Sequence, residues 1–195
     1  MWHQPCYDEE WALVSNAVSK RQKEFQAGRN CARQALAQLG IKNHPVLSGP
    51  RREPIWPEGI VGSITHCKDF CAVALSKKSE HKAIGIDAEE KSPLDINSLD
   101  LVCTLAEQTW LNKNGLNNTF WSKVIFSAKE SLFKCYYPLT HEYLDFLEAE
   151  FTLNLDNNTF SATIPGNPAE PFNKNIPIEG RFLLDEKYIY TSLVL

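Results

Sequence analysis

The stretch Ile84-Gly85-Ile86-Asp87-Ala88-Glu89-Glu90 lies near the middle of this chain of 195 residues. Side chains two apart on a strand point to the same face, so a strand here puts Asp87 and Glu89 on one face. Ile86 and Ala88 then pack on the other face. Two carboxylates on one rigid element suit a hard cation such as Mg²⁺. The alternative is a strand end that runs into a solvated acidic turn, and both interpretations stay open on this stretch alone.

Short β-prone runs and helical stripes surround this strand in the first half of the chain. The sequence predicts a β-meander over residues 60–65, 70–75 and 83–87. Before it, the Pro-rich residues 44–57 predict an ordered loop. Helical spacing predicts a helix over residues 9–26 and a second one after Gly28, which ends at a C-cap on Gly40.

The second half follows the same order of helical segments and then strands. Helical spacing predicts a helix that begins near Leu101 and stops at Asn114-Gly115, and a second helical stripe over residues 121–136 that is ended by Pro138. The tail predicts two hairpins, which pair residues 148–155 with 159–164 and residues 181–184 with 187–194. We therefore predict an α+β fold of two lobes, residues 1–95 and 96–195, with their junction at residues 93–99.

Composition and charge exclude several classes of protein. Apolar residues make up 43% and charged residues 23% of the chain, which excludes a disordered or collagen-like protein. No apolar run approaches the ~20 residues of a membrane-spanning helix, and the first residues lack the apolar region of a secretory signal, so we expect a cytoplasmic protein. The net charge of −4 argues against nucleic-acid binding. Six scattered cysteines indicate reduced thiols.

Two further groups of polar residues are candidates for chemistry. Glu130 and Lys134 stand four apart on the predicted helix over residues 121–136, which is also the spacing of a surface ion pair worth about 0.3–0.5 kcal/mol. Ser63 and His66, at the end of a predicted strand, offer a hydroxyl and an imidazole that can donate to a phosphate. A lone histidine in such a place is more often structural.

Basic residues and cysteines give weaker signals. Arg29 and Arg33 stand four apart near the start of a predicted helix, where their guanidinium groups would face an anion together. His66, Cys67 and Cys71 lie close in sequence, but no second pair of ligands stands at zinc spacing, so a soft-metal site is disfavoured. A cysteine nucleophile at Cys67 is also disfavoured, because adjacent strand residues such as His66 point to opposite faces.

Five motifs, in this order, resemble those of the 4'-phosphopantetheinyl transferases. They are Gly28-Arg29-Asn30-Cys31-Ala32-Arg33, Gly49-Pro50-Arg51-Arg52-Glu53-Pro54 with Trp56-Pro57, Gly62-Ser63-Ile64-Thr65-His66-Cys67, Ile84-Gly85-Ile86-Asp87-Ala88-Glu89 and Phe126-Ser127-Ala128-Lys129-Glu130-Ser131-Leu132-Phe133-Lys134. Within that family the chain resembles the branch that primes siderophore and other nonribosomal peptide synthetases, typified by enterobactin synthetase component D. The resemblance runs from Lys20 to Pro138, and the acidic and Lys-Glu motifs are its specific part.

The resemblance implies a fold, a reaction and partners. The fold is two similar α/β lobes in a pseudo-twofold arrangement, with Mg²⁺ and coenzyme A in the cleft between them. The implied reaction moves the 4'-phosphopantetheine arm of coenzyme A to a serine of an apo carrier protein domain and releases adenosine 3',5'-bisphosphate. The implied partners are carrier domains of nonribosomal peptide or polyketide synthetases. Because the cleft is internal, we expect a monomer.

The resemblance also implies roles for residues at matching positions. Asp87, Glu89 and Glu130 would be the Mg²⁺ ligands, and Glu130 would also be the base for the carrier serine. Lys129 and Lys134 would contact the phosphates of coenzyme A, where Lys134 would take part in catalysis.

The remaining matches concern the coenzyme alone. Ser63 and His66 would hold its phosphates, and Arg29 and Arg51 would clamp the 3'-phosphate of its nucleotide. Arg33 matches less closely, and a structural role is its alternative.

Two other functions fit the same residues. A metal-dependent phosphohydrolase uses carboxylates with lysine and histidine to activate water rather than a serine. A non-catalytic scaffold would bind carrier proteins or a nucleotide without turnover. Release of the bisphosphate from coenzyme A with Mg²⁺ and no carrier would favour the hydrolase, and tight binding without turnover would favour the scaffold.

Overall fold

The computed structural model describes residues 2, 4–116, 118–174 and 176–195. Its helices are α1 (Asp8–Ala12), α2 (Ser19–Gln38), α3 (Leu99–Val102), α4 (Leu105–Lys113) and α5 (Asn118–Thr140), with 3₁₀ turns η1 (Ile96–Ser98) and η2 (Phe146–Glu148). Its strands are β1 (Leu47–Ser48), β2 (Pro54–Ile55), β3 (Ile60–Cys67), β4 (Phe70–Lys77), β5 (Ile84–Glu90), β6 (Glu150–Asn154), β7 (Thr159–Thr163), β8 (Ile178–Leu184) and β9 (Tyr188–Val194). The α+β prediction is confirmed. None of the described helices is long and apolar enough to cross a membrane.

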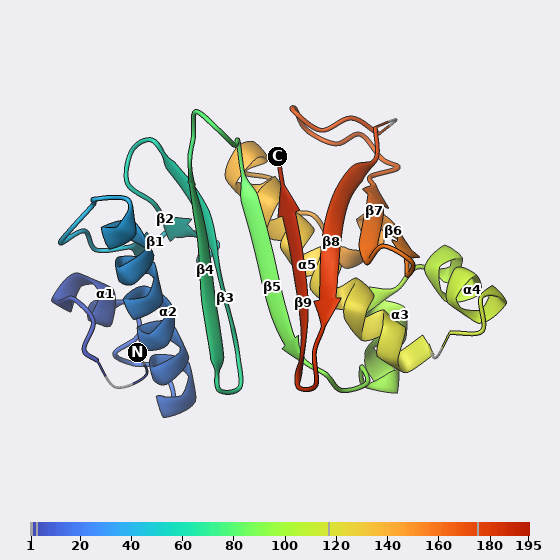
Figure 1. Ribbon diagram of the computed structural model, residues 1–195, viewed down its shortest axis with the longest axis horizontal. Coiled ribbons are helices and arrows are strands. Elements are labelled where there is room, and N and C mark those ends of the chain that lie inside the picture. Colours follow the sequence, from blue (N-terminus) through green and yellow to red (C-terminus); the bar gives the residue numbers. More distant parts are fainter. Residues whose placement is uncertain (1, 3, 117, 175) are drawn as a thin grey trace.

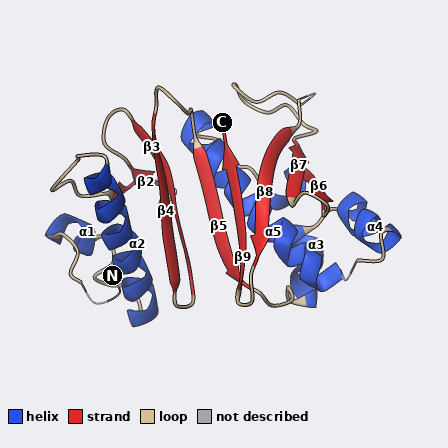
Figure 2. Ribbon diagram, viewed as in Figure 1, coloured by secondary structure: helices blue, strands red, loops and turns tan. Residues whose placement is uncertain are grey.

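The strands form three antiparallel sheets. β1 pairs with β2, β3 pairs with β4, and the largest sheet has the order β5-β9-β8-β7-β6. Figure 1 shows α2 beside the β3–β4 hairpin and α5 behind the five-stranded sheet. Both predicted tail hairpins are confirmed as β6–β7 and β8–β9, which appear as adjacent arrows in Figure 2.

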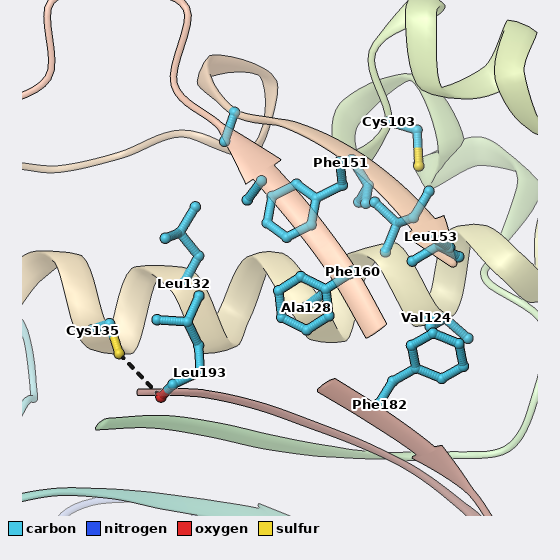
Figure 3. Packing of buried hydrophobic residues seen from close by; sticks show 14 of the residues in the cluster. Cys103, Val124, Ala128, Leu132, Cys135, Phe151, Leu153, Phe160, Phe182 and Leu193 are labelled. Carbon is cyan, nitrogen blue, oxygen red and sulfur yellow. Dashed lines mark hydrogen bonds between the residues drawn. The ribbon is translucent and has the colours of Figure 1, made fainter. Parts of the chain in front are cut away.

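Helix α5 follows from the apolar stripe that predicted it. Val124, Ala128 and Leu132 are completely buried and belong to the main hydrophobic core. Full burial of a side chain such as Leu132 contributes about 1.5–3 kcal/mol to folding. Figure 3 shows this face of α5 packed against Phe151 and Phe160, while the thiol of Cys135 donates a 3.4 Å hydrogen bond to the carbonyl oxygen of Leu193. The helix runs two residues beyond its predicted end, with Pro138 in its last turn.

Helix boundaries elsewhere differ from the prediction. The chain does not break at Gly28, because α2 passes through it and a Cβ there would lie 3.2 Å from Cγ2 of Ile64. Glycine thus permits a close approach of α2 to β3 rather than ending the helix. The helix predicted from Leu101 is two helices, since Thr104 caps α4 by accepting a hydrogen bond from the Glu107 amide. Its predicted stop at Asn114-Gly115 agrees with the end of α4 at Lys113.

The β-meander prediction is wrong for its third strand, because β5 pairs with β9 and not with β4. Hydroxyl groups of β3 satisfy the amides on the free edge of β5. Ser63 Oγ accepts a hydrogen bond from the Ile86 amide at 3.1 Å, and Thr65 Oγ1 accepts one from the Ala88 amide at 2.9 Å. β5 comes before the predicted lobe junction, but its hydrogen-bonded partner β9 comes after that junction. The division of the chain at residue 95 stays a prediction.

Candidate functional site

A cavity of about 660 Å³ is lined by α2, β3, β5, α5 and the loop around β1 and β2. Eight of the ten residues predicted for the site line it, and they come from both halves of the chain: Arg29, Arg51, Ser63, His66, Asp87, Glu89, Glu130 and Lys134. The structure thus brings together side chains that are up to 105 residues apart in sequence. The two exceptions are Arg33 and Lys129.

Asp87 is the most strongly held carboxylate of the cavity and is 6% exposed. Its Oδ1 accepts hydrogen bonds from Lys134 Nζ at 2.7 Å and from Thr65 Oγ1 at 3.1 Å, and its Oδ2 accepts one from Ser127 Oγ at 2.8 Å. These donors come from β3 and α5, so Asp87 lies where the two halves meet. Lys134 of α5 therefore forms its ion pair with Asp87 of β5 and not with Glu130 on its own helix, which was the alternative interpretation of their spacing.

Glu89 and Glu130 complete the acidic group. Glu89 forms an ion pair with Lys123 of α5. Glu130 has no hydrogen-bond or ion-pair partner among the described residues. Burial raises the pKa of both carboxyl groups, and Asp87 raises the pKa of each further through charge repulsion.

The three carboxylates do not form a ready-made metal centre. In the described part of the chain, no three His, Cys, Asp or Glu side chains stand close enough together to hold an ion as they are. Asp87 and Glu89 are instead each neutralised by a lysine. The donor set still suits a hard cation, because three oxygen donors of like charge line one cavity and interact with one another.

Arginines dominate another part of the cavity wall. Arg29 donates to Ser48 Oγ at 2.8 Å and lies over the ring of Phe25 at 4.3 Å, while its buried Nε has no hydrogen-bond partner among the described residues. Burial lowers the pKa of Arg29 to about 10, so the guanidinium is charged at neutral pH. A buried cation with an unused donor favours binding of an anion.

Arg51 lies on the loop between β1 and β2. Its guanidinium stands 5.4 Å from the ring of Tyr143, which belongs to the other half of the chain. The side chain thus contacts the other half of the chain, and no described residue takes its guanidinium donors, which a ligand in the cavity can use.

His66 lies beside both a cation and an anion. Arg21 Nη1 is 3.2 Å from Nε2 of His66, and Glu24 is 3.9 Å from its Nδ1. Because arginine only donates, Nε2 must accept and the imidazole proton sits on Nδ1. Burial lowers the pKa of His66, which favours this neutral form.

Arg33 and Lys129 lie outside the cavity wall. Arg33 donates to the buried carboxylate of Glu10 at 3.0 Å and covers the ring of Tyr7, so it has the structural role that was its alternative. Lys129 is 3% exposed and pairs with Glu107 at 2.9 Å. Its ammonium group donates to protein acceptors, and with Glu130 it lines a separate cavity of about 120 Å³, so its expected contact to phosphates stays a prediction.

Sequence reasoning missed several residues that line the cavity or hold the acidic group. Lys123 and Ser127 precede Glu130 by seven and three positions on α5, a spacing that places all three on one helix face. Lys78 and Lys82 line the cavity from the connection between β4 and β5. In the sequence these two lysines belong to a basic cluster, and such a cluster is also typical of a solvent-exposed surface.

Cys67 is the cysteine that was considered as a nucleophile. All six are free thiols. Cys67 is not among the described residues that line the cavity. Burial raises the pKa of Cys67 to about 12, so its reactive thiolate is scarce at neutral pH.

Comparison with known proteins agrees with the motifs. Residues 9–76 match the family described as the 4'-phosphopantetheinyl transferase N-terminal domain, and residues 83–177 match the 4'-phosphopantetheinyl transferase superfamily. The chain is 40% identical over 193 residues to the 4'-phosphopantetheinyl transferase Svp of Streptomyces mobaraensis, which covers 97% of this chain and 78% of Svp.

Two other relatives differ in how much they share. The 4'-phosphopantetheinyl transferase PptT of Mycobacterium tuberculosis is 32% identical over 198 residues, covering 96% of this chain and 85% of PptT. Enterobactin synthase component D of Escherichia coli is 36% identical over only 126 residues, covering 64% of this chain and 59% of that protein. The similarity to the enterobactin protein is therefore partial.

Proposed function

Because the chain belongs to the 4'-phosphopantetheinyl transferase superfamily and is a 4'-phosphopantetheinyl transferase, we propose that its donor is coenzyme A and its acceptor a serine of an apo carrier domain. The observation that supports this most is the convergence of eight predicted side chains on one cavity. The partial similarity to enterobactin synthase component D supports carriers of siderophore or other nonribosomal peptide synthetases as acceptors. Polyketide carriers remain within the same proposal.

We propose that the cavity lies between two similar lobes about a pseudo-twofold axis, divided at residue 95. Within each half one long helix packs on a strand, α2 on β4 in the first and α5 on β9 in the second, which supports this arrangement. A single chain then supplies the whole cleft, and we propose that it acts as a monomer.

Asp87, Glu89 and Glu130 would hold Mg²⁺. Their oxygen donors line one cavity, and a divalent cation would relieve the repulsion from Asp87 and Glu89, which adds to burial in raising the pKa of Glu130. When bound, Mg²⁺ supplies positive charge to phosphate oxygens.

The chain's own residues then have separate tasks in the transfer. The serine oxygen forms a bond to the β-phosphorus of coenzyme A, and the bond from that phosphorus to the oxygen bridging it to the α-phosphate breaks. The serine proton passes to Glu130, whose carboxylate is unpaired within the described chain and whose raised pKa suits a base. The electron pair leaves with adenosine 3',5'-bisphosphate.

Cationic side chains stabilise the charge on that leaving group. Within the described residues Lys134 uses two donors, on Asp87 Oδ1 and on the carbonyl oxygen of Ile86, which leaves its third N–H for a phosphate oxygen. Arg29 and Arg51 would hold the 3'-phosphate. Ser63 and His66 line the same cavity and would hold the other phosphates.

The test is mass spectrometry of an apo carrier domain incubated with coenzyme A and this protein, with and without Mg²⁺. We expect the carrier to gain one phosphopantetheine arm on serine, and removal of Mg²⁺ by a chelator to stop the gain. Release of the bisphosphate at the same rate without any carrier would instead indicate a phosphohydrolase. Binding of carrier or coenzyme A with no product under any condition would indicate a scaffold.

A further inference from the structure

Lys129 and Glu107 form an ion pair inside the second half of the chain. The side chain of Lys129 is 2% exposed, that of Glu107 is 1% exposed, and their charged atoms are 2.9 Å apart. Besides Glu107, the Lys129 ammonium donates to the carbonyl oxygens of Val102 at 2.9 Å and Phe146 at 2.6 Å. All three of its N–H donors are therefore used.

Glu107 extends these contacts to two more segments. Its Oε1 accepts a hydrogen bond from the Phe151 amide at 2.8 Å, and its Oε2 accepts one from the Thr104 amide at 2.8 Å. The pair thus ties α5 to the end of α3, the start of α4, the turn η2 and strand β6. No other carboxylate–ammonium pair among the described residues is as fully buried.

The anchored residue is the immediate neighbour of Glu130. Successive residues of an α-helix are rotated by about 100°, so fixing the direction of Lys129 also fixes the direction of Glu130. Lys129 donates to α3, α4 and η2, whereas Glu130 lines the 660 Å³ cavity, and the two side chains share only a smaller cavity of about 120 Å³. Glu130 itself has no partner among the described residues to hold it in place. Its orientation therefore depends on the helix that carries it.

We propose that Lys129 and Glu107 are a positioning pair, which sets the rotation of α5 so that Glu130 faces the reacting serine. This inference rests on the proposed role of Glu130 as the base. A buried ion pair is weak support for stability, because desolvation of both charges offsets their attraction. The pair instead fixes an orientation, because three acceptors in three different segments hold the Lys129 side chain in one direction.

The experiment measures kcat and KM for coenzyme A in Lys129→Arg, Lys129→Met and Glu107→Gln, each at a temperature where circular dichroism shows the variant folded. We expect Glu107→Gln and Lys129→Met to lower kcat about 100-fold, the cost of misplacing a reacting group by about 1 Å. KM for coenzyme A should stay within about twofold of wild type, because the arginines that hold it lie elsewhere. Lys129→Arg retains the charge, and we expect it to recover at least a tenth of the wild-type kcat.

The matched control is Glu10→Gln, which disrupts another buried ion pair, with Arg33, away from the cavity wall. We expect it to lower the unfolding midpoint and leave kcat unchanged. The proposal is overturned if folded Glu107→Gln and Lys129→Met keep the wild-type kcat, if their loss lies in KM alone, or if Glu10→Gln loses as much. Glu130→Gln separates this proposal from the proposed function. Full activity of Glu130→Gln would contradict the role of Glu130 as the base. An inactive Glu130→Gln together with a fully active Glu107→Gln would contradict only the positioning pair.

Discussion

Replacing Glu130 by glutamine is expected to lower the rate of 4'-phosphopantetheine transfer about 10³-fold, within the range that a general base contributes. Glutamine retains the size of the side chain but accepts no proton and is a poor ligand for a hard cation. Because Glu130 has no partner among the described residues, its replacement breaks no hydrogen bond described in the structure. The loss should therefore appear in kcat without a lower unfolding midpoint.

The measurement is the initial rate of carrier modification by mass spectrometry, together with a urea unfolding curve for each variant. Glu150→Gln is the matched control, since Glu150 is exposed on β6 and does not line the cavity. A Glu130→Gln enzyme that modifies the carrier at the wild-type rate would show that another group takes the serine proton.

Gly85→Ala is expected to affect both stability and activity. Gly85 lies on β5 where α5 crosses it, and a Cβ at this position would overlap the carbonyl group of Ser131 and lie 3.2 Å from the Cys135 amide nitrogen. Both neighbours are helix backbone, so α5 must move away from β5. Overpacking of this kind costs about 1–3 kcal/mol. The same shift separates Asp87 and Glu89 from Glu130, and we expect transfer to slow about 100-fold.

Unfolding midpoints and transfer rates of Gly85→Ala and Gly166→Ala test this expectation. Gly166 is the control because a Cβ there would meet no atom within 4 Å. Wild-type stability and rate in Gly85→Ala would mean that the distance between β5 and α5 does not set the geometry of the acidic group.

The local part of this site was predictable from sequence. Alternation over residues 84–90 placed Asp87 and Glu89 on one face, and both do line the cavity. The apolar stripe of α5 placed Glu130 and Lys134 together on its other side, and both line the cavity as well. Strand alternation (period 2) and helical spacing (period 3.6) predict which side chains share a face, because that depends only on local backbone geometry.

The non-local part was not predictable in the same way. Nothing in residues 84–90 shows that β5 pairs with β9, a strand about 100 positions later, rather than with β4. The role of Lys129 could not be predicted for the same reason. A lysine next to a glutamate on a helix can either bind a ligand or form a buried ion pair with a residue far away in the sequence. Its partner left a signal of its own, because the Thr104 to Glu107 spacing is that of a capping box.

The central claim is that Asp87, Glu89 and Glu130 bind one divalent ion together with the pyrophosphate of coenzyme A. The most direct measurement is a crystal structure with coenzyme A and Mn²⁺ in place of Mg²⁺, in which anomalous scattering locates the metal. We predict one metal peak in contact with all three carboxylates and with the pyrophosphate. A metal peak away from these carboxylates, or a pyrophosphate bound outside the cavity they line, would contradict the claim.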